Sequence, residues 1–108
     1  MAKGAIRTGI NILLGEAGFT TSDLDKVIIA GAFGTYLDVA SAITIGMFPQ
    51  LPLERFGQVG NAAGIGAKLA LVSKEQRAKA EEIARHAQYI ELAAKPYFAE
   101  EFTRAMLL

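Results

Sequence analysis

The residues of this chain best suited to chemistry are glycines at the end of a short apolar segment. Residues 27–34 read Val-Ile-Ile-Ala-Gly-Ala-Phe-Gly, so strand-forming residues run directly into Gly31 and Gly34. Because glycine has no Cβ atom, the backbone there can adopt a positive φ and a flat ligand can lie against the peptide plane. The pattern suits a nucleotide base or ribose as ligand, but taken alone these residues are better explained by an ordinary strand followed by a turn.

A second glycine-rich segment, residues 60–67, reads Gly-Asn-Ala-Ala-Gly-Ile-Gly-Ala. It matches neither common phosphate-binding signature. Counted from Gly60, Ile65 stands where a Walker A loop needs glycine, and a Gly-x-Gly-x-x-Gly pattern begun at Gly64 fails at Leu69. The small residues would let another helix approach closely, either as a hinge or as simple tight packing, and Asn61 fits a helix cap better than a ligand contact.

Helix and strand signals alternate along the rest of the chain. In the first half of the chain we expect a helix over 5–14, a turn over 21–25, a strand over 27–30, a turn over 31–34, and a helix from an Asp38 cap to before Pro49. In the second half we expect a strand over 56–59, a helix over 62–72 and a helix from Ser73 to about His86. A strand or helix extension over 89–92 and a helix that Pro96 begins should follow. This order implies a small parallel sheet with right-handed crossovers. Ligands of such sheets bind at the carboxyl ends of the strands, so both glycine-rich segments should lie at the same edge.

Composition limits the classes of partner. The 108 residues suffice for a single domain over 1–108 with a modest core. Eleven basic residues balance eleven acidic ones, so nothing in the charge favours nucleic acid or a membrane as partner. The chain has no cysteine and no signal-peptide pattern, and we expect a cytoplasmic protein. A mean hydropathy of +0.30 is high for a small soluble domain and indicates apolar surface that a neighbour covers.

No catalytic constellation stands out. Neither paired carboxylates, nor a nucleophile with its base, nor a cluster of metal ligands can be assembled with any specificity. We therefore expect no catalytic residue and no metal site in this chain, and an independent enzyme is the least favoured class.

Five segments together resemble the carboxyl-terminal region of the reductive activators of corrinoid proteins, and the resemblance covers nearly the whole chain. They are residues 2–10 (AKGAIRTGI), 29–38 (IAGAFGTYLD), 45–49 (IGMFP), 59–63 (VGNAA) and 90–92 (IEL). That family belongs to the ASKHA superfamily of actin, sugar kinases and chaperone ATPases. By this resemblance residues 27–34 correspond to the adenosine motif, and residues 60–67 to the second connecting helix at the interdomain hinge.

The resemblance implies an α/β fold: part of a ribonuclease H-like, actin-like ATPase half-domain, with a small, mainly parallel sheet of two or three strands and about five helices. It also implies a partial ATP or ADP site to which this chain contributes the adenosine-side wall, through Gly31, Ala32, Phe33, Gly34, Gly60 and Asn61. The Asp-x-Gly-Thr hairpins that hold phosphates and magnesium in the superfamily do not occur in these 108 residues. The chain thus resembles a C-terminal fragment of a larger ATPase-like protein, whose iron–sulfur domain would also lie outside it.

For the intact parent, the resemblance implies that adenine nucleotide binding or hydrolysis closes two half-domains and helps an iron–sulfur centre reduce a Co(II) corrinoid to Co(I). The expected partners are the remainder of the parent chain, a corrinoid protein or corrinoid methyltransferase, and a second copy of the chain in a homodimer. The isolated chain is expected to be inactive. The alternative is a non-catalytic interaction or dimerisation module of a larger iron–sulfur protein, with no nucleotide role.

Overall fold

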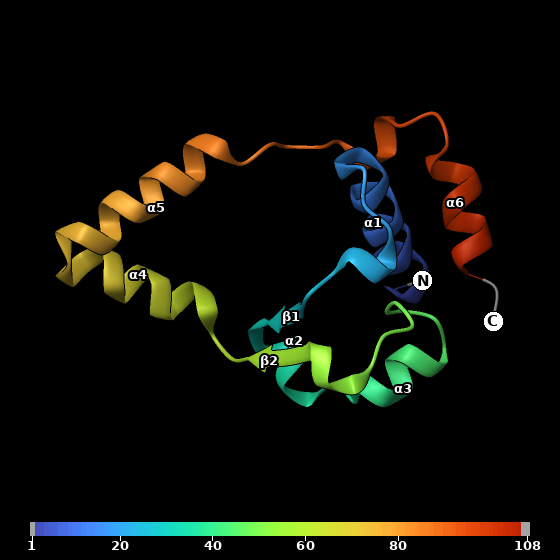
Figure 1. Cartoon of the computed structure of the whole chain (residues 1–108), viewed down its shortest axis with the longest axis horizontal. Helices are drawn as coiled ribbons and strands as arrows, with labels where there is room; N and C mark the ends of the chain where they lie inside the picture. The colour runs from blue at the N-terminus through green and yellow to red at the C-terminus, as the bar shows by residue number, and fades with distance from the viewer. Residues whose placement is uncertain (1, 107–108) are drawn as a thin grey trace. The chain divides into compact units, whose positions relative to one another are not determined.

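The computed structural model describes residues 2–106 (Figure 1). Their elements, in chain order, are α1 (Ala2–Ala17), the 3-10 turn η1 (Thr21–Asp23), β1 (Val27–Ala30), α2 (Gly31–Tyr36), α3 (Val39–Thr44), η2 (Leu53–Arg55), β2 (Phe56–Val59), α4 (Ala62–Val72), α5 (Lys74–His86), η3 (Leu92–Ala94) and α6 (Phe98–Ala105). None of the helices described within residues 2–106 combines the length and apolar character needed to cross a membrane.

The two strands form a two-stranded parallel sheet. Gly31, the first residue after β1, donates its N–H to the carbonyl oxygen of Gly60, the first residue after β2, at 2.8 Å. The carboxyl ends of the strands therefore lie side by side, as a parallel pair requires. The predicted α/β class is confirmed, with helices making up most of the described chain.

The contacts divide the chain into two compact units. Unit 1 comprises Met1–Ile28, Leu37–Gly57 and Glu91–Leu108, and unit 2 comprises Ile29–Tyr36 and Gln58–Ile90. All buried hydrophobic side chains among residues 2–106 belong to unit 1, and they are Ile12, Ala42, Met47 and Phe48. Unit 1 thus holds the hydrophobic core of the described chain.

Helix α1 supplies one wall of that core. Gly4, Thr8 and Ile12 recur at four-residue spacing and are the buried residues of the helix. Helix α6 lies beside α1 (Figure 1), and a Cβ atom added at Gly4 would come within 2.6 Å of the Met106 side chain. The glycine therefore allows the close approach of the two helices.

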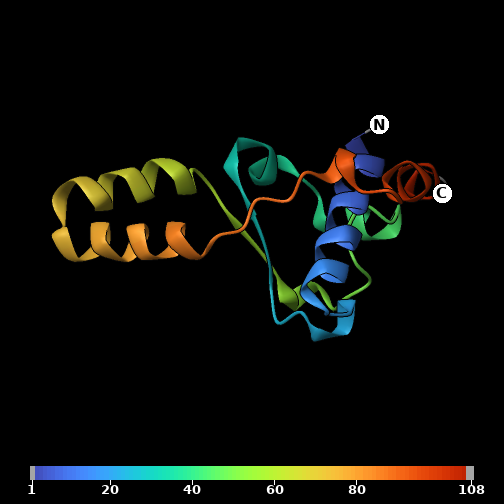
Figure 2. The ribbon, with the colours of Figure 1, turned by 90° about the horizontal axis from the view of Figure 1, so that it is seen from above.

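Unit 2 carries an antiparallel hairpin of α4 and α5 (Figure 2). Ser73 joins the two helices, and its hydroxyl oxygen accepts a 3.2 Å hydrogen bond from the backbone N–H of Gln76, as the capping pattern predicts. The Arg77 side chain donates to the carbonyl oxygen of Ala70 at 2.9 Å and so satisfies a C-terminal carbonyl of α4. The hairpin leaves several large apolar side chains exposed, namely Ile65, Leu69, Leu71, Val72 and Ile83.

Three local predictions were wrong. Residues 31–34 belong to helix α2 and form no separate turn, because Gly31 adopts a φ of +90° and lets the chain pass from strand to helix at once. Residues 89–92 form neither a strand nor an extension of α5: the helix ends at His86, and the 3-10 turn η3 begins at Leu92. Pro96 does not begin the last helix, because α6 starts at Phe98.

The helix after Asp38 is shorter than expected. The Asp38 carboxylate accepts from the backbone N–H of Ser41 at 3.3 Å, which confirms the predicted N-cap. The helix ends at Thr44, because Gly46 adopts a φ of +85°, the left-handed conformation that terminates many helices.

Candidate functional site

The candidate site lies in unit 2, where the two strands end. The N–H of Gly31 donates to the carbonyl oxygen of Gly60 at 2.8 Å, and the N–H of Ala62 donates to the same oxygen at 2.8 Å. The first residues of the two glycine-rich segments are therefore neighbours. The two segments therefore lie at the same edge of the sheet, as predicted from the sequence.

Gly31 and Gly60 both present bare backbone to open space. A Cβ atom added at either residue would meet no atom within 4 Å beyond its chain neighbours. Gly31 has a φ of +90°, which side-chain-bearing residues rarely adopt. Gly60 has no such restriction, so its lack of a side chain is not dictated by backbone geometry or by crowding.

Gly34 has a different role from the one predicted for a residue at a ligand-contacting turn. It is buried, and an added Cβ atom would lie 2.5 Å from Cγ2 of Ile29 and 3.2 Å from the backbone carbonyl of Ile29. Its carbonyl oxygen accepts a hydrogen bond from the Gln58 side chain. Gly34 is thus a packing residue that lets α2 lie close to β1.

Two further predicted site residues, Ala32 and Phe33, belong to helix α2. Ala32 is exposed in the first turn of α2. The backbone of Phe33 belongs to the same helix, but the expected contact of its side chain with a base lies outside what the structure describes. The segment therefore brings one small exposed side chain next to the open peptide of Gly31.

Asn61 is a helix cap. Its side-chain oxygen accepts a 2.9 Å hydrogen bond from the backbone N–H of Gly64 and so satisfies a free donor in the first turn of α4. A Cβ atom added at Gly64 would collide with the Asn61 amide group, so the glycine leaves room for the cap. Asn61 and Gly64 together hold the start of α4 beside Gly60.

The chemistry available at this site is binding. The Gly31 and Gly60 peptides offer flat, uncharged surface, and no acid, base or nucleophile is among the residues that the sequence places there. Within residues 2–106 no group of three or more His, Cys, Asp or Glu side chains is placed to hold a metal ion. An arrangement of this kind suits the neutral, planar part of a ligand.

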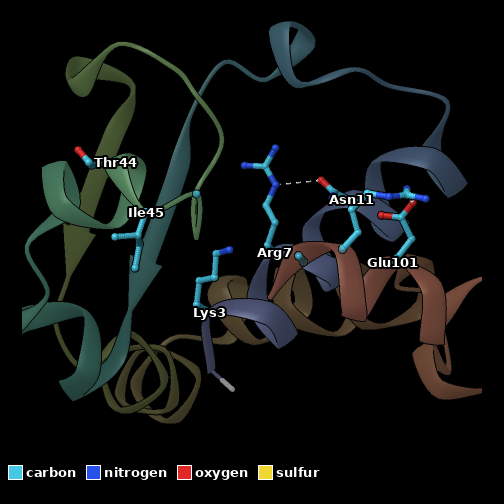
Figure 3. A pocket seen from close by; sticks show the side chains of 9 residues that line it. Lys3, Arg7, Asn11, Thr44, Ile45 and Glu101 are labelled. Atoms are coloured by element: carbon cyan, nitrogen blue, oxygen red, sulfur yellow. Dashed lines mark hydrogen bonds and ion pairs between the residues drawn. The ribbon is translucent and has the colours of Figure 1, made fainter. Parts of the chain in front are cut away.

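Sequence reasoning missed a cationic pocket in unit 1. Lys3, Arg7 and Asn11 line it from one face of α1, and Glu101 and Arg104 line it from α6 (Figure 3). The four-residue spacing of Lys3, Arg7 and Asn11 was the signal that could have identified this face. That Glu101 and Arg104 of α6 lie beside this face could not be predicted from residue spacing within α1.

Comparisons with known proteins agree on one family. Residues 1–108 match the profile of a family described as the C-terminal domain of RACo, the ASKHA domain. The corrinoid activation enzyme RamQ of Eubacterium limosum is 43% identical over 102 residues, which are 94% of this chain and 17% of RamQ. A solved structure of a reductive activator for corrinoid, iron–sulfur protein is similar with a TM-score of 0.84 and 40% sequence identity, over 94% of this chain and 16% of that one.

The chain therefore spans about one sixth of the length of these two relatives. The similarity runs through both glycine-rich segments, because it covers nearly all of the chain. The full match to the family profile, together with these identities, shows that this chain belongs to the family of RACo C-terminal, ASKHA domains.

Proposed function

We propose that this chain is the C-terminal part of an ATP-dependent reductive activator of corrinoid proteins and that it supplies the adenosine-side wall of the nucleotide cleft. The relatives that it resembles are named as a corrinoid activation enzyme and a reductive activator. Bound adenine nucleotide would supply the free energy for closing the parent protein around its electron-transfer reaction. An iron–sulfur centre elsewhere in the parent, a corrinoid protein as partner and a cytoplasmic location belong to the same proposal.

The observation that carries the proposal is the paired, open backbone of Gly31 and Gly60. Their 2.8 Å hydrogen bond aligns two peptide groups at the carboxyl ends of parallel strands, where ligands of such sheets bind. No side chain would meet a Cβ atom placed at either residue. A base or ribose can therefore approach both peptides within van der Waals distance.

The neighbouring residues act indirectly in this proposal. Gly34 seats α2 on β1, and Asn61 holds the first turn of α4, so each positions one of the two open peptides. Ala32 and Phe33 are proposed to flank the nucleoside. Helix α4 would pass motion of the cleft to the rest of the protein as its hinge helix.

A substitution at Gly60 tests this function more cleanly than one at Gly31. A side chain at Gly31 would be strained by the φ of +90°, so lost binding there would also follow from local misfolding. Gly60→Leu adds bulk to open space without that strain. The matched control is Gly66→Leu in α4, which also adds a side chain where no atom lies within 4 Å.

Calorimetric titration of ADP into the intact protein that carries this chain gives the measurement. We expect Gly60→Leu to weaken ADP binding at least tenfold, about 1.4 kcal/mol, because leucine occupies the space of the nucleoside. Gly66→Leu should bind ADP as the parent sequence does. Equal affinities for Gly60→Leu and the parent sequence, with circular dichroism unchanged, would rule out the Gly60 peptide as part of the wall.

The exposed apolar side chains of the α4–α5 hairpin favour a second candidate, an interaction module. Leu71 is 77% exposed and Val72 is 79% exposed, which is unusual for side chains of this size at a helix end. An interaction module requires no nucleotide. It would be favoured if ADP binding were absent from the intact protein and sedimentation showed an assembly that Leu71→Lys dissociates.

A further inference from the structure

Helix α2 is held against both strands by residues of unit 2. At its start, Gly31 donates its backbone N–H to the carbonyl oxygen of Gly60 at 2.8 Å. Further along the helix, Gly34 packs against Ile29 of β1. The side-chain amide of Gln58 in β2 donates to the carbonyl oxygen of Gly34. The Gln58 bond therefore ties the body of α2 to the second strand.

The carbonyl oxygen of Gly34 requires a donor from outside the helix. The last four carbonyl groups of an α-helix have no partner within it, and Gly34 is among these four because α2 spans Gly31–Tyr36. Gly34 is buried, and an unpaired backbone carbonyl costs free energy in a buried position. The Gln58 side chain supplies the donor from a strand residue two positions before Gly60.

The two hydrogen bonds fix different parts of α2. Glycine permits backbone rotation that other residues resist, so the bond between Gly31 and Gly60 fixes the start of the helix and leaves its direction open. The Gln58 bond holds a second point three residues later, about 4.5 Å further along the helix axis. Two fixed points set the direction of α2 relative to β2. Ala32, which is exposed, lies between them.

We propose that Gln58 is the positioning residue of the adenosine-side wall. It holds α2 on β2 without touching the nucleoside and so keeps the Gly31 and Gly60 peptides aligned. The meaning for ligand binding rests on the nucleotide role proposed above, whereas the alignment itself belongs to the fold and can be measured without nucleotide. Gln58 is exposed, so its replacement removes the bond without opening a cavity in the core.

Hydrogen exchange of the Gly31 amide, followed by mass spectrometry in the intact protein that carries this chain, measures the alignment. In Gln58→Leu this amide should exchange about threefold to tenfold faster than in the parent sequence, the range that one hydrogen bond is worth. The Gln76 amide, which is bonded to the Ser73 hydroxyl in the α4–α5 hairpin, is the internal control and should exchange at an unchanged rate. Equal exchange of the Gly31 amide in both proteins would overturn the proposal.

Gln58→Glu tests the donated proton. An ionised carboxylate only accepts and would repel the Gly34 carbonyl oxygen, whereas a protonated carboxyl group donates as the amide does. Calorimetry with adenosine should show Gln58→Glu binding about threefold to tenfold more weakly than the parent sequence near pH 8, and the deficit should shrink near pH 5. Gln58→Leu should keep its deficit at both pH values. Gln76→Glu makes the same change of charge in α5 and should bind adenosine as the parent sequence does.

Adenosine is the probe because it carries no phosphate that an added carboxylate would repel. Equal adenosine affinities for Gln58→Leu and the parent sequence would refute a positioning role for Gln58, as would a deficit in Gln58→Glu that does not change with pH. If the parent sequence bound no adenosine, the proposed nucleotide role would fail. Faster exchange of the Gly31 amide in Gln58→Leu would still support the alignment of the two peptides by Gln58.

Discussion

Replacement of Gly34 by alanine tests the packing role that the structure gives this residue. The added Cβ atom would lie 2.5 Å from Cγ2 of Ile29, about 1 Å inside ordinary contact distance. Rotation of the Ile29 side chain cannot relieve the whole conflict, because the carbonyl carbon and oxygen of Ile29 both lie 3.2 Å from the same position. Helix α2 must therefore move away from β1.

The expected loss combines two opposing terms. Overpacking of this kind costs about 1–3 kcal/mol, while alanine in a helix gains about 0.5–1 kcal/mol over glycine. The net change is a destabilisation of up to about 2.5 kcal/mol. Gly66→Ala provides the matched control, because Gly66 lies inside α4 with no atom within 4 Å of an added Cβ, and it should stabilise by about 0.8–1 kcal/mol.

Urea unfolding followed by circular dichroism measures both variants. The chain contains no tryptophan, so backbone ellipticity is a better probe than fluorescence. The two variants should shift the unfolding free energy in opposite directions at an unchanged m value. The gap between them should be about 1–3 kcal/mol, which is the overpacking cost that only Gly34→Ala incurs. If Gly34→Ala stabilised the protein as much as Gly66→Ala does, the close approach of α2 to β1 would be wrong.

Two further predictions concern a cap and an ion pair. Asn61→Ala should lower the unfolding free energy by about 1 kcal/mol because it removes the acceptor for the Gly64 N–H, whereas Asn61→Ser should retain most of the stability; equal urea midpoints for the two variants would contradict the capping role. In unit 1, the hydrogen bond from Lys95 and then that from Tyr97 lower the pKa of the Glu16 carboxyl. The stabilisation from ionised Glu16 is therefore complete above the usual carboxyl pKa and is lost as the pH falls through the lowered value. The stability difference between the parent sequence and Glu16→Gln, measured by urea unfolding at a series of pH values, should shrink in acid, and a difference that does not depend on pH would refute this linkage.

The sequence by itself determined the elements whose signals are local. The strands occur over Val27–Ala30 and Phe56–Val59, as predicted from short apolar or β-branched segments. Asp38, Asn61 and Ser73 each cap a helix through a backbone N–H three residues later. Such bonds involve neighbours in sequence, so residue types and spacing are enough to predict them.

Only the tertiary structure decided what the glycines do and which distant residues meet. Gly31 and Gly34 look alike in sequence, but one adopts a positive φ in open space and the other is packed against Ile29. Residues 89–92 alternate as a strand does, yet they form no strand, and the 3-10 turn η3 begins at Leu92. The hydrogen bond between Gly31 and Gly60 and the meeting of α1 with α6 around Arg7 join segments far apart in the chain. Contacts of this kind depend on how the whole chain packs, and spacing along one segment does not contain that information.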